Sequence, residues 1–115
     1  MKVNIILEKT FNFSLEIIKI YNLLVLKKEF VMSKQLLRSG TSIGANIHEA
    51  QGSISRREFI AKVQISHKEL LETDYWLRLL KQSGYFNDVL LRSVDDDLLE
   101  LKKILTTILN TSKNS

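Results

Sequence analysis

The sequence predicts an all-α protein, an antiparallel up-down four-helix bundle in a single domain covering residues 1–115. The chain contains no proline and only four glycines, so nothing interrupts long helices. Apolar residues recur with helical or heptad spacing in four stretches. The connections between these stretches are short, which places consecutive helices side by side and antiparallel.

The first helix is expected at about residues 8–28. Apolar side chains cover more of this stretch than the roughly 100° face that a surface helix buries. They are Phe11, Phe13, Leu15, Ile17, Ile18, Ile20, Tyr21, Leu23, Leu24, Val25 and Leu26. Since a four-helix monomer has no central position, we expect another subunit to cover part of this helix.

The second helix is expected at residues 31–50, and its second half is rich in small residues. One helical face there consists of Leu36, Gly40, Ile43, Ile47 and Ala50. A glycine inside a helix costs roughly 1 kcal/mol against alanine, so Gly40 and Gly44 indicate a surface that something approaches closely. Two interpretations remain open, tight packing of helices or subunits and the floor of a binding groove. The residues expected at this contact are Gly40, Ser42, Gly44, Asn46 and Glu49.

Local signals mark the ends of the helices. Gly52 is expected as a left-handed cap of the second helix. Ser55 and Glu58 have the spacing of a capping box, which starts a third helix at residues 55–82, and Gly84 follows it as a stop. A fourth helix is expected at residues 88–109, starting at Asn87 or Asp88, with a frayed tail after it. Heptad positions in these two helices are Phe59, Val63, Ser66, Leu70, Thr73, Leu77 and Leu80, then Leu91, Val94, Leu98, Leu101, Leu105 and Ile108.

The sequence lacks the patterns of most catalytic chemistry. Without cysteine, neither disulfides nor thiol chemistry is possible. Di-iron bundles need Glu-x-x-His, but Ala45 precedes His48 and Gln64 precedes His67 at that spacing. The glycines lie in a helical pattern without the lysine of a phosphate loop. We expect no catalytic residues, no metal and no cofactor, and therefore no enzyme.

Two further observations concern location. Glu8 and Lys9 break the N-terminal apolar run before it could serve as a signal peptide. No stretch approaches the roughly 18 apolar residues of a membrane span. We expect a cytoplasmic protein that does not contact a membrane.

The net charge is +4, from 17 basic and 13 acidic residues. Residues 1–28 contribute +3 and residues 54–84 contribute +2, which is compatible with a polyanionic partner. The candidate phosphate contacts are Arg38, Arg56, Arg57, Lys62 and Lys68. Alternatively, these side chains form ion pairs within the bundle or at a subunit interface.

Three motifs carry a family resemblance: S-I-G-A-N-I-x-E-A at residues 42–50, S-R-R-E-F-I at 55–60 and K-E-L-L-E-T-D-Y-W-L at 68–77. They resemble the bacterial four-helix-bundle proteins of the 23S rRNA intervening-sequence (S23) family, over about residues 11–109. Similarity to the accessory protein of diversity-generating retroelements further implies a homopentamer whose basic surface engages nucleic acid and a reverse transcriptase. The resemblance brings no catalytic residues.

Three functions follow as hypotheses. The first is a non-enzymatic homo-oligomer that binds nucleic acid, structured RNA or DNA, through basic surface residues that contact its backbone. The second is a protein–protein scaffold or accessory subunit that docks a partner protein without touching nucleic acid. The third, a nuclease, requires a cluster of His, Arg and acidic side chains in one pocket.

Overall fold

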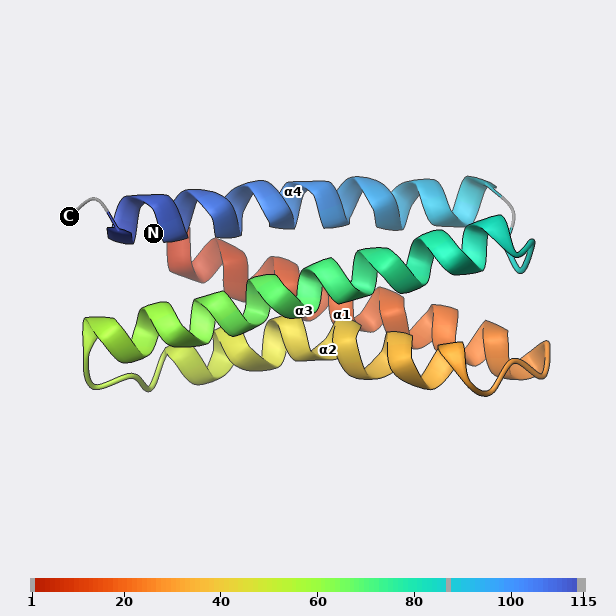
Figure 1. Ribbon diagram of the computed structural model, residues 1–115, viewed down its shortest axis with the longest axis horizontal. Coiled ribbons are helices and arrows are strands. Elements are labelled where there is room, and N and C mark those ends of the chain that lie inside the picture. Colours follow the sequence, from red (N-terminus) through yellow and green to blue (C-terminus); the bar gives the residue numbers. More distant parts are fainter. Residues whose placement is uncertain (1, 87, 114–115) are drawn as a thin grey trace.

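The computed structural model describes the backbone of residues 2–86 and 88–113 and the side chains of residues 5–86 and 91–112. Its four α-helices run antiparallel along one long axis (Figure 1). They are α1 (Lys2–Leu26), α2 (Met32–Ala50), α3 (Arg56–Gln82) and α4 (Asp88–Lys113). No strand occurs among the residues described, so the predicted all-α bundle is confirmed.

The helix bounds differ from the predicted ranges mainly at the two ends of the chain. α1 begins at Lys2 instead of residue 8. Ile6, which precedes the charged residues Glu8 and Lys9, packs in the core and stabilises this additional turn of the helix. α4 reaches Lys113 instead of residue 109, and Ile108 and Leu109 pack against the core there. Residues 110–113, expected to fray, are therefore helical. Asn87, one of the two expected start residues of α4, lies outside the described residues.

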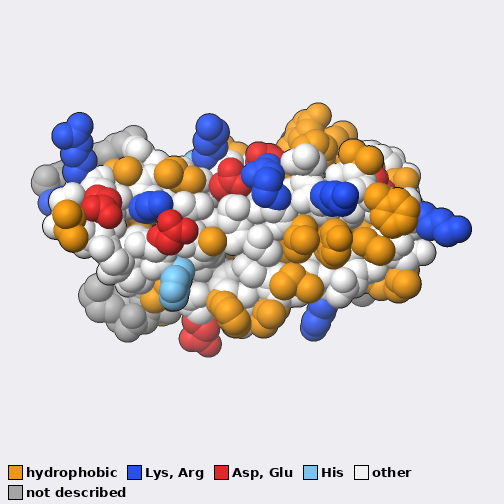
Figure 2. Space-filling model, turned by 90° about the horizontal axis from the view of Figure 1, so that it is seen from below, with side chains coloured by type: hydrophobic (Ala, Val, Ile, Leu, Met, Phe, Trp, Pro, Cys, Tyr) orange, Lys and Arg blue, Asp and Glu red, His pale blue; other side chains and the backbone are white. Residues whose placement is uncertain are grey.

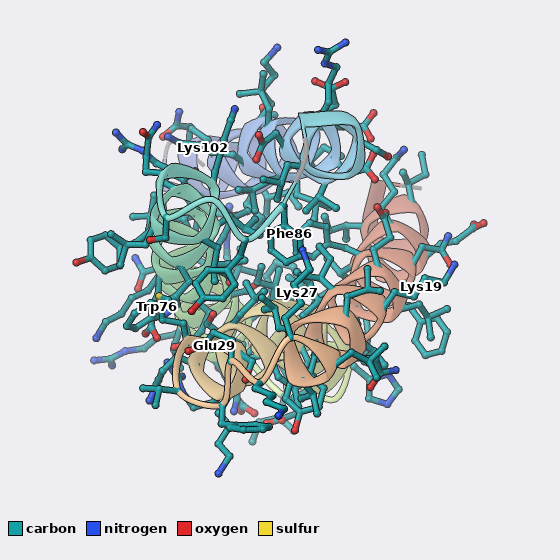
Figure 3. The ribbon with its side chains drawn as sticks, turned by 90° about the vertical axis from the view of Figure 1, so that its right-hand side faces the viewer. Lys19, Lys27, Glu29, Trp76, Phe86 and Lys102 are labelled. Atoms are coloured by element: carbon teal, nitrogen blue, oxygen red, sulfur yellow. The ribbon has the colours of Figure 1, made fainter. Side chains whose placement is uncertain are left out.

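All four helices contribute to one apolar core. Seen end-on, they occupy the corners of a square, with α1 opposite α3 and α2 opposite α4 (Figure 3). α2 packs closely against α1 and α3, whereas α4 contacts its two neighbours more sparsely. The core residues are Ile6, Phe13, Ile17, Ile20, Leu24, Leu36, Ile43, Ile47, Val63, Leu70, Leu77, Leu80, Leu91, Val94, Leu98, Leu101 and Leu105.

Two helices end in the same left-handed turn. After α3, Gly84 has φ +80°, its N–H donates to Lys81 O at 3.2 Å, and the next N–H donates to Leu80 O. After α1, Lys28 takes the equivalent position with φ +63° and donates to Val25 O at 2.9 Å. Both are Schellman motifs, but the second uses a residue that pays a steric cost for the left-handed conformation.

The predicted left-handed cap at Gly52 is wrong. The φ of Gly52 is not positive, and its N–H instead donates to Glu49 O at 3.0 Å. α2 therefore ends in a tightened turn of i→i+3 bonds, which any residue can adopt. This turn leads to Ser55, whose Oγ accepts a hydrogen bond from Glu58 N at 3.1 Å and caps α3.

Glu29 is a capping residue that the sequence did not reveal. Its carboxylate accepts hydrogen bonds from Ser33 N at 2.6 Å and Val31 N at 3.2 Å, which satisfies two unpaired donors at the start of α2. The side chain is buried while doing so. The neighbouring Lys27 donates to Tyr85 O and lies 5.6 Å from the centre of the Phe86 ring (Figure 3). These contacts join the α1–α2 turn to the α3–α4 turn.

Candidate interaction surfaces of the bundle

The two glycines of α2 face α1. A Cβ atom on Gly40 would lie 2.8 Å from both Cγ atoms of Ile17, and one on Gly44 would lie 3.1 Å from Thr10 O. The absence of these side chains lets the two helices approach closely. Since α1 covers this face of α2, the two glycines do not form the floor of an open groove.

The other side of α2 meets α3 through a buried polar layer. Ser66 Oγ donates to Ile43 O at 2.8 Å. Thr73 Oγ1 lies 3.0 Å from Ser39 Oγ and 2.8 Å from Glu69 O. Ser39, Ser66 and Thr73 are completely buried, so hydrogen bonding offsets the cost of removing their hydroxyls from water. Two of these residues are the small polar members of the α3 heptad pattern.

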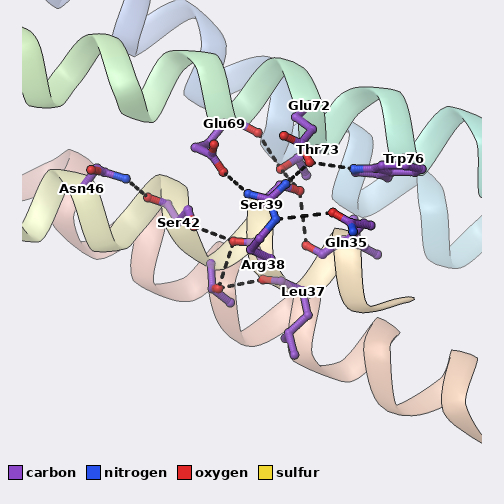
Figure 4. A network of polar contacts seen from close by, with 12 residues as sticks. Gln35, Leu37, Arg38, Ser39, Ser42, Asn46, Glu69, Glu72, Thr73 and Trp76 are labelled. Carbon is purple, nitrogen blue, oxygen red and sulfur yellow. Dashed lines mark hydrogen bonds and ion pairs between the residues drawn. The ribbon is translucent and has the colours of Figure 1, made fainter. Parts of the chain in front are cut away.

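Arg38 lies in a carboxylate cluster (Figure 4). Its guanidinium forms ion pairs with Glu69, at 3.0 Å, and with Glu72. Glu72 also accepts a hydrogen bond from Trp76 Nε1 at 2.9 Å. With two carboxylates to one guanidinium, the cluster is formally −1. The Arg38 side chain is 49% exposed, but its charge is already compensated.

The other predicted phosphate contacts are spread along α3 in different surroundings. Lys62 donates to Glu49 at 2.8 Å, and this hydrogen bond lowers the pKa of the Glu49 carboxyl. Arg56 donates to Ser112 O at 3.2 Å. Arg57 and Lys68 are exposed and form no ion pair with any side chain that the structure describes. The five residues therefore do not form one continuous unpaired patch.

Two more residues of the expected close contact bond within α2. Ser42 Oγ donates to Arg38 O at 2.6 Å, and Asn46 Nδ2 donates to Ser42 O at 2.8 Å (Figure 4). Both side chains are half-buried on the side of α2 that carries the Arg38 cluster. They are positioned by their own helix, and neither bonds to another helix within the part of the chain that the structure describes.

A pair of carboxyl groups joins α1 to α4. Burial, a hydrogen bond that protonated Glu16 donates to Asp97, and the negative charge of Asp97 raise the pKa of Glu16 to about 7, and the positive charge of Lys19 opposes this shift only in part. The pair borders a hollow of about 260 Å³, next to an ion pair between Lys9 and Glu100 at 2.9 Å. Asp97 belongs to an acidic run at residues 95–97 that is visible in the sequence. Its pairing with Glu16 is not visible there, because it depends on how α1 is rotated against α4.

The first apolar surface lies on the outside of α1. Phe11, Leu15, Ile18 and Leu26 are exposed and share one stripe at helical spacing, which we call the α1 outer face. Phe11 is 64% and Leu26 is 79% exposed. Hydrophobic side chains gather in Figure 2 toward the end that carries the α1–α2 turn, where Phe30 and Val31 are also exposed. Large exposed apolar patches are a common feature of protein interaction sites.

The second apolar surface lies between α3 and α4. A groove of about 730 Å³ runs between these helices, and exposed Leu71, Tyr75 and Leu99 contribute to its lining. We call it the α3–α4 groove. Its charged lining residues are Asp74, Arg78, Lys81, Asp95 and Lys102.

The described residues contain no group of three or more His, Asp or Glu side chains that could hold a metal ion. Within the same part of the chain, no helix has both the length and the apolar character to cross a membrane. His48 is exposed on α2 and His67 half-buried on α3.

The described residues form an all-helical bundle with two exposed apolar surfaces, and some of its charged side chains are paired while others are not. The family model of the 23S rRNA-intervening sequence protein matches residues 2–107, and the chain belongs to that family. A crystal structure of a protein of unknown function from the S23 ribosomal protein family of Bacteroides thetaiotaomicron is similar, with 47% identity and a TM-score of 0.92. The match covers 96% of this chain and 99% of that one. Comparison with functionally curated proteins found no match.

Proposed function

We propose that this chain is a non-enzymatic bundle that assembles with copies of itself in the cytoplasm and acts as a protein–protein scaffold. The observation that carries the proposal is the α1 outer face. Four large apolar side chains, Phe11, Leu15, Ile18 and Leu26, are exposed on the side of α1 opposite the core. A helix that is apolar on both sides is suited to burial between two bundles.

The energy available from this surface is of the right order for association. Full burial of one exposed Leu, Ile or Phe side chain contributes about 1.5–3 kcal/mol. Allowing for their partial exposure, covering the four side chains contributes roughly 3–7 kcal/mol. Association costs about 4–15 kcal/mol in lost freedom of motion. A stable assembly therefore needs a second apolar surface opposite the first.

The test is the mass of the purified chain in solution. Light scattering after gel filtration is expected to give an oligomer, and five copies is the number that the resemblance to the retroelement accessory protein implies. Assembly through apolar surface should persist in about 1 M NaCl, because salt screens charge but does not weaken hydrophobic burial. A monomer at all accessible concentrations would overturn the proposal.

Binding of RNA or DNA is the second candidate function. Its support is the net charge of +4 per chain, about +20 in five copies, together with Arg57 and Lys68, which are exposed and form no ion pair with the side chains that the structure describes. Binding should weaken steeply with salt, because phosphate contacts release counterions. Replacing both residues with glutamate should reduce the affinity measured by fluorescence anisotropy.

Arg38→Gln is the matched control, since its guanidinium is already paired with Glu69 and Glu72. The double glutamate variant should lose far more affinity than this control. Absence of salt-sensitive binding to either nucleic acid would remove the candidate while leaving the assembly proposal intact. In that case a partner protein, including a reverse transcriptase, remains the class of ligand to test.

A further inference from the structure

We propose that the α1 outer face of one copy docks into the α3–α4 groove of the next copy. This inference rests on the proposed self-association and specifies its geometry. The contact is heterologous, because one copy contributes the ridge and its neighbour contributes the groove.

Exposed apolar side chains concentrate on these two surfaces. Of the large hydrophobic residues that the structure describes as exposed, most lie on α1 and the turn after it. Three others, Leu71, Tyr75 and Leu99, lie together in the groove. A single binding mode that joins the ridge to the groove covers both surfaces at once.

The shapes of the two surfaces are complementary. The outer face of a single helix is a convex row of side chains about one turn apart, and such rows pack into grooves on neighbouring helices. The α3–α4 groove runs between two helices, and buried Leu70, Leu77 and Leu98 contribute to its lining. Its volume of about 730 Å³ leaves room for several side chains of a third helix.

Charges beside the two surfaces can also be matched. Glu8 and Lys19 flank the α1 outer face, and Lys19 points away from the bundle (Figure 3). The groove carries both acidic and basic groups. Asp95 is held only loosely by Lys81, at 3.9 Å, so a lysine from a neighbouring copy could pair with it. Arg78 and Lys102 offer partners for a carboxylate such as Glu8.

The two surfaces can be occupied in one chain at the same time. α1 packs against α2 and α4 and lies diagonally opposite α3 (Figure 3). The ridge of one copy therefore does not obstruct its own groove. Repetition of a heterologous contact generates a ring when the rotation closes and a filament when it does not. A symmetric contact between two α1 outer faces would instead leave both grooves uncovered.

A complementation experiment tests this arrangement. One variant carries Phe11→Glu and Ile18→Glu on the ridge, and the other carries Leu71→Glu and Leu99→Glu in the groove. Each is expected to be a folded monomer by circular dichroism and light scattering. Their equimolar mixture should form a dimer, because each variant retains the surface that the other lacks. His48→Glu, at an exposed position on α2, is the control and should assemble like the parent chain.

The other outcomes are also informative. A monomeric parent chain would overturn the proposed function and this inference together. An oligomeric parent chain with a groove variant that still assembles would overturn the inference alone, and so would two monomeric variants that do not pair. If either variant fails to fold, cysteine cross-linking replaces it, since the chain has no cysteine of its own. The double variant Ile18→Cys, Leu71→Cys should form disulfide-linked trimers and larger species, whereas dimers from Ile18→Cys alone would refute the arrangement.

Discussion

The carboxyl pair between α1 and α4 makes the stability of the bundle depend on pH. Glu16 has a pKa of about 7 in the folded chain against 4.5 for an ordinary glutamate. The folded state therefore binds this proton more tightly than the unfolded state does. The stabilisation is complete below about pH 4.5 and is lost as the pH rises through about 7.

The magnitude follows from the size of the shift. One pKa unit corresponds to about 1.36 kcal/mol, so the full shift has an upper limit of roughly 3 kcal/mol. Because Glu16 is only partly buried, solvent screening reduces this to about 1 kcal/mol. The perturbation that removes the titration is Glu16→Gln, which keeps a hydrogen-bonding side chain of the same size beside Asp97.

The assay is urea denaturation at about pH 5 and about pH 8, at one protein concentration because self-association adds to apparent stability. Between the two pH values, the free energy of unfolding of the parent chain should fall by about 1 kcal/mol more than that of the Glu16→Gln variant. Both chains keep the two histidines, Lys9 and Lys19, so any effect of these groups on the pH dependence of stability cancels in the comparison. Glu100→Gln, which removes a carboxylate paired with Lys9 on the same seam, is the control and should keep the parent's pH dependence. Equal losses in the parent and Glu16→Gln would refute the reasoning.

Three further substitutions test the backbone features by thermal or urea unfolding. Gly40→Ala should destabilise the chain by about 1–3 kcal/mol, because its Cβ would lie 2.8 Å from the branched, buried side chain of Ile17. Gly52→Ala is the control and should be nearly neutral, since no atom lies closer than 3.6 Å to the position of its Cβ. Equal effects of the two substitutions would contradict the close-approach argument. Lys28→Gly should stabilise by about 0.5–1 kcal/mol, because φ +63° strains a side-chain-bearing residue, and a lower melting temperature would argue against strain there. Glu29→Ala should lower the free energy of unfolding by about 1–2 kcal/mol, because it leaves two N–H groups at the start of α2 unpaired. A neutral result would mean that water replaces the cap.

The helices could be predicted from the sequence because each carries its own periodic signal. The heptad positions of α3 and α4 are local patterns, and Ser55 and Gly84 are local end signals. Lys28 gave no such signal, since a lysine rarely adopts the left-handed conformation. Its geometry is imposed by the packing of the helices on either side.

The candidate site was harder to predict because its partners are distant in the sequence. Arg38 and Lys62 are basic and exposed enough to suggest phosphate contacts, but each faces a carboxylate on a neighbouring helix. The α3–α4 groove likewise has no linear signature, because it forms where α3 and α4 pack sparsely. By contrast, the apolar excess of α1 was visible in its composition alone.

The buried hydroxyl layer between α2 and α3 has a consequence for the register in which the two helices pack. Apolar side chains of similar size would tolerate sliding of α3 along α2 by one heptad. Such a slide would place Ser66 opposite Ser39 and would carry Thr73 away from the hydroxyl it now meets at 3.0 Å. Thr73 would keep its bond to Glu69 O within α3 but would lose its contact with Ser39 Oγ, and one hydrogen bond of this kind contributes about 0.5–1.5 kcal/mol. The layer therefore specifies the register of α3 relative to α2, as single polar residues do in coiled coils.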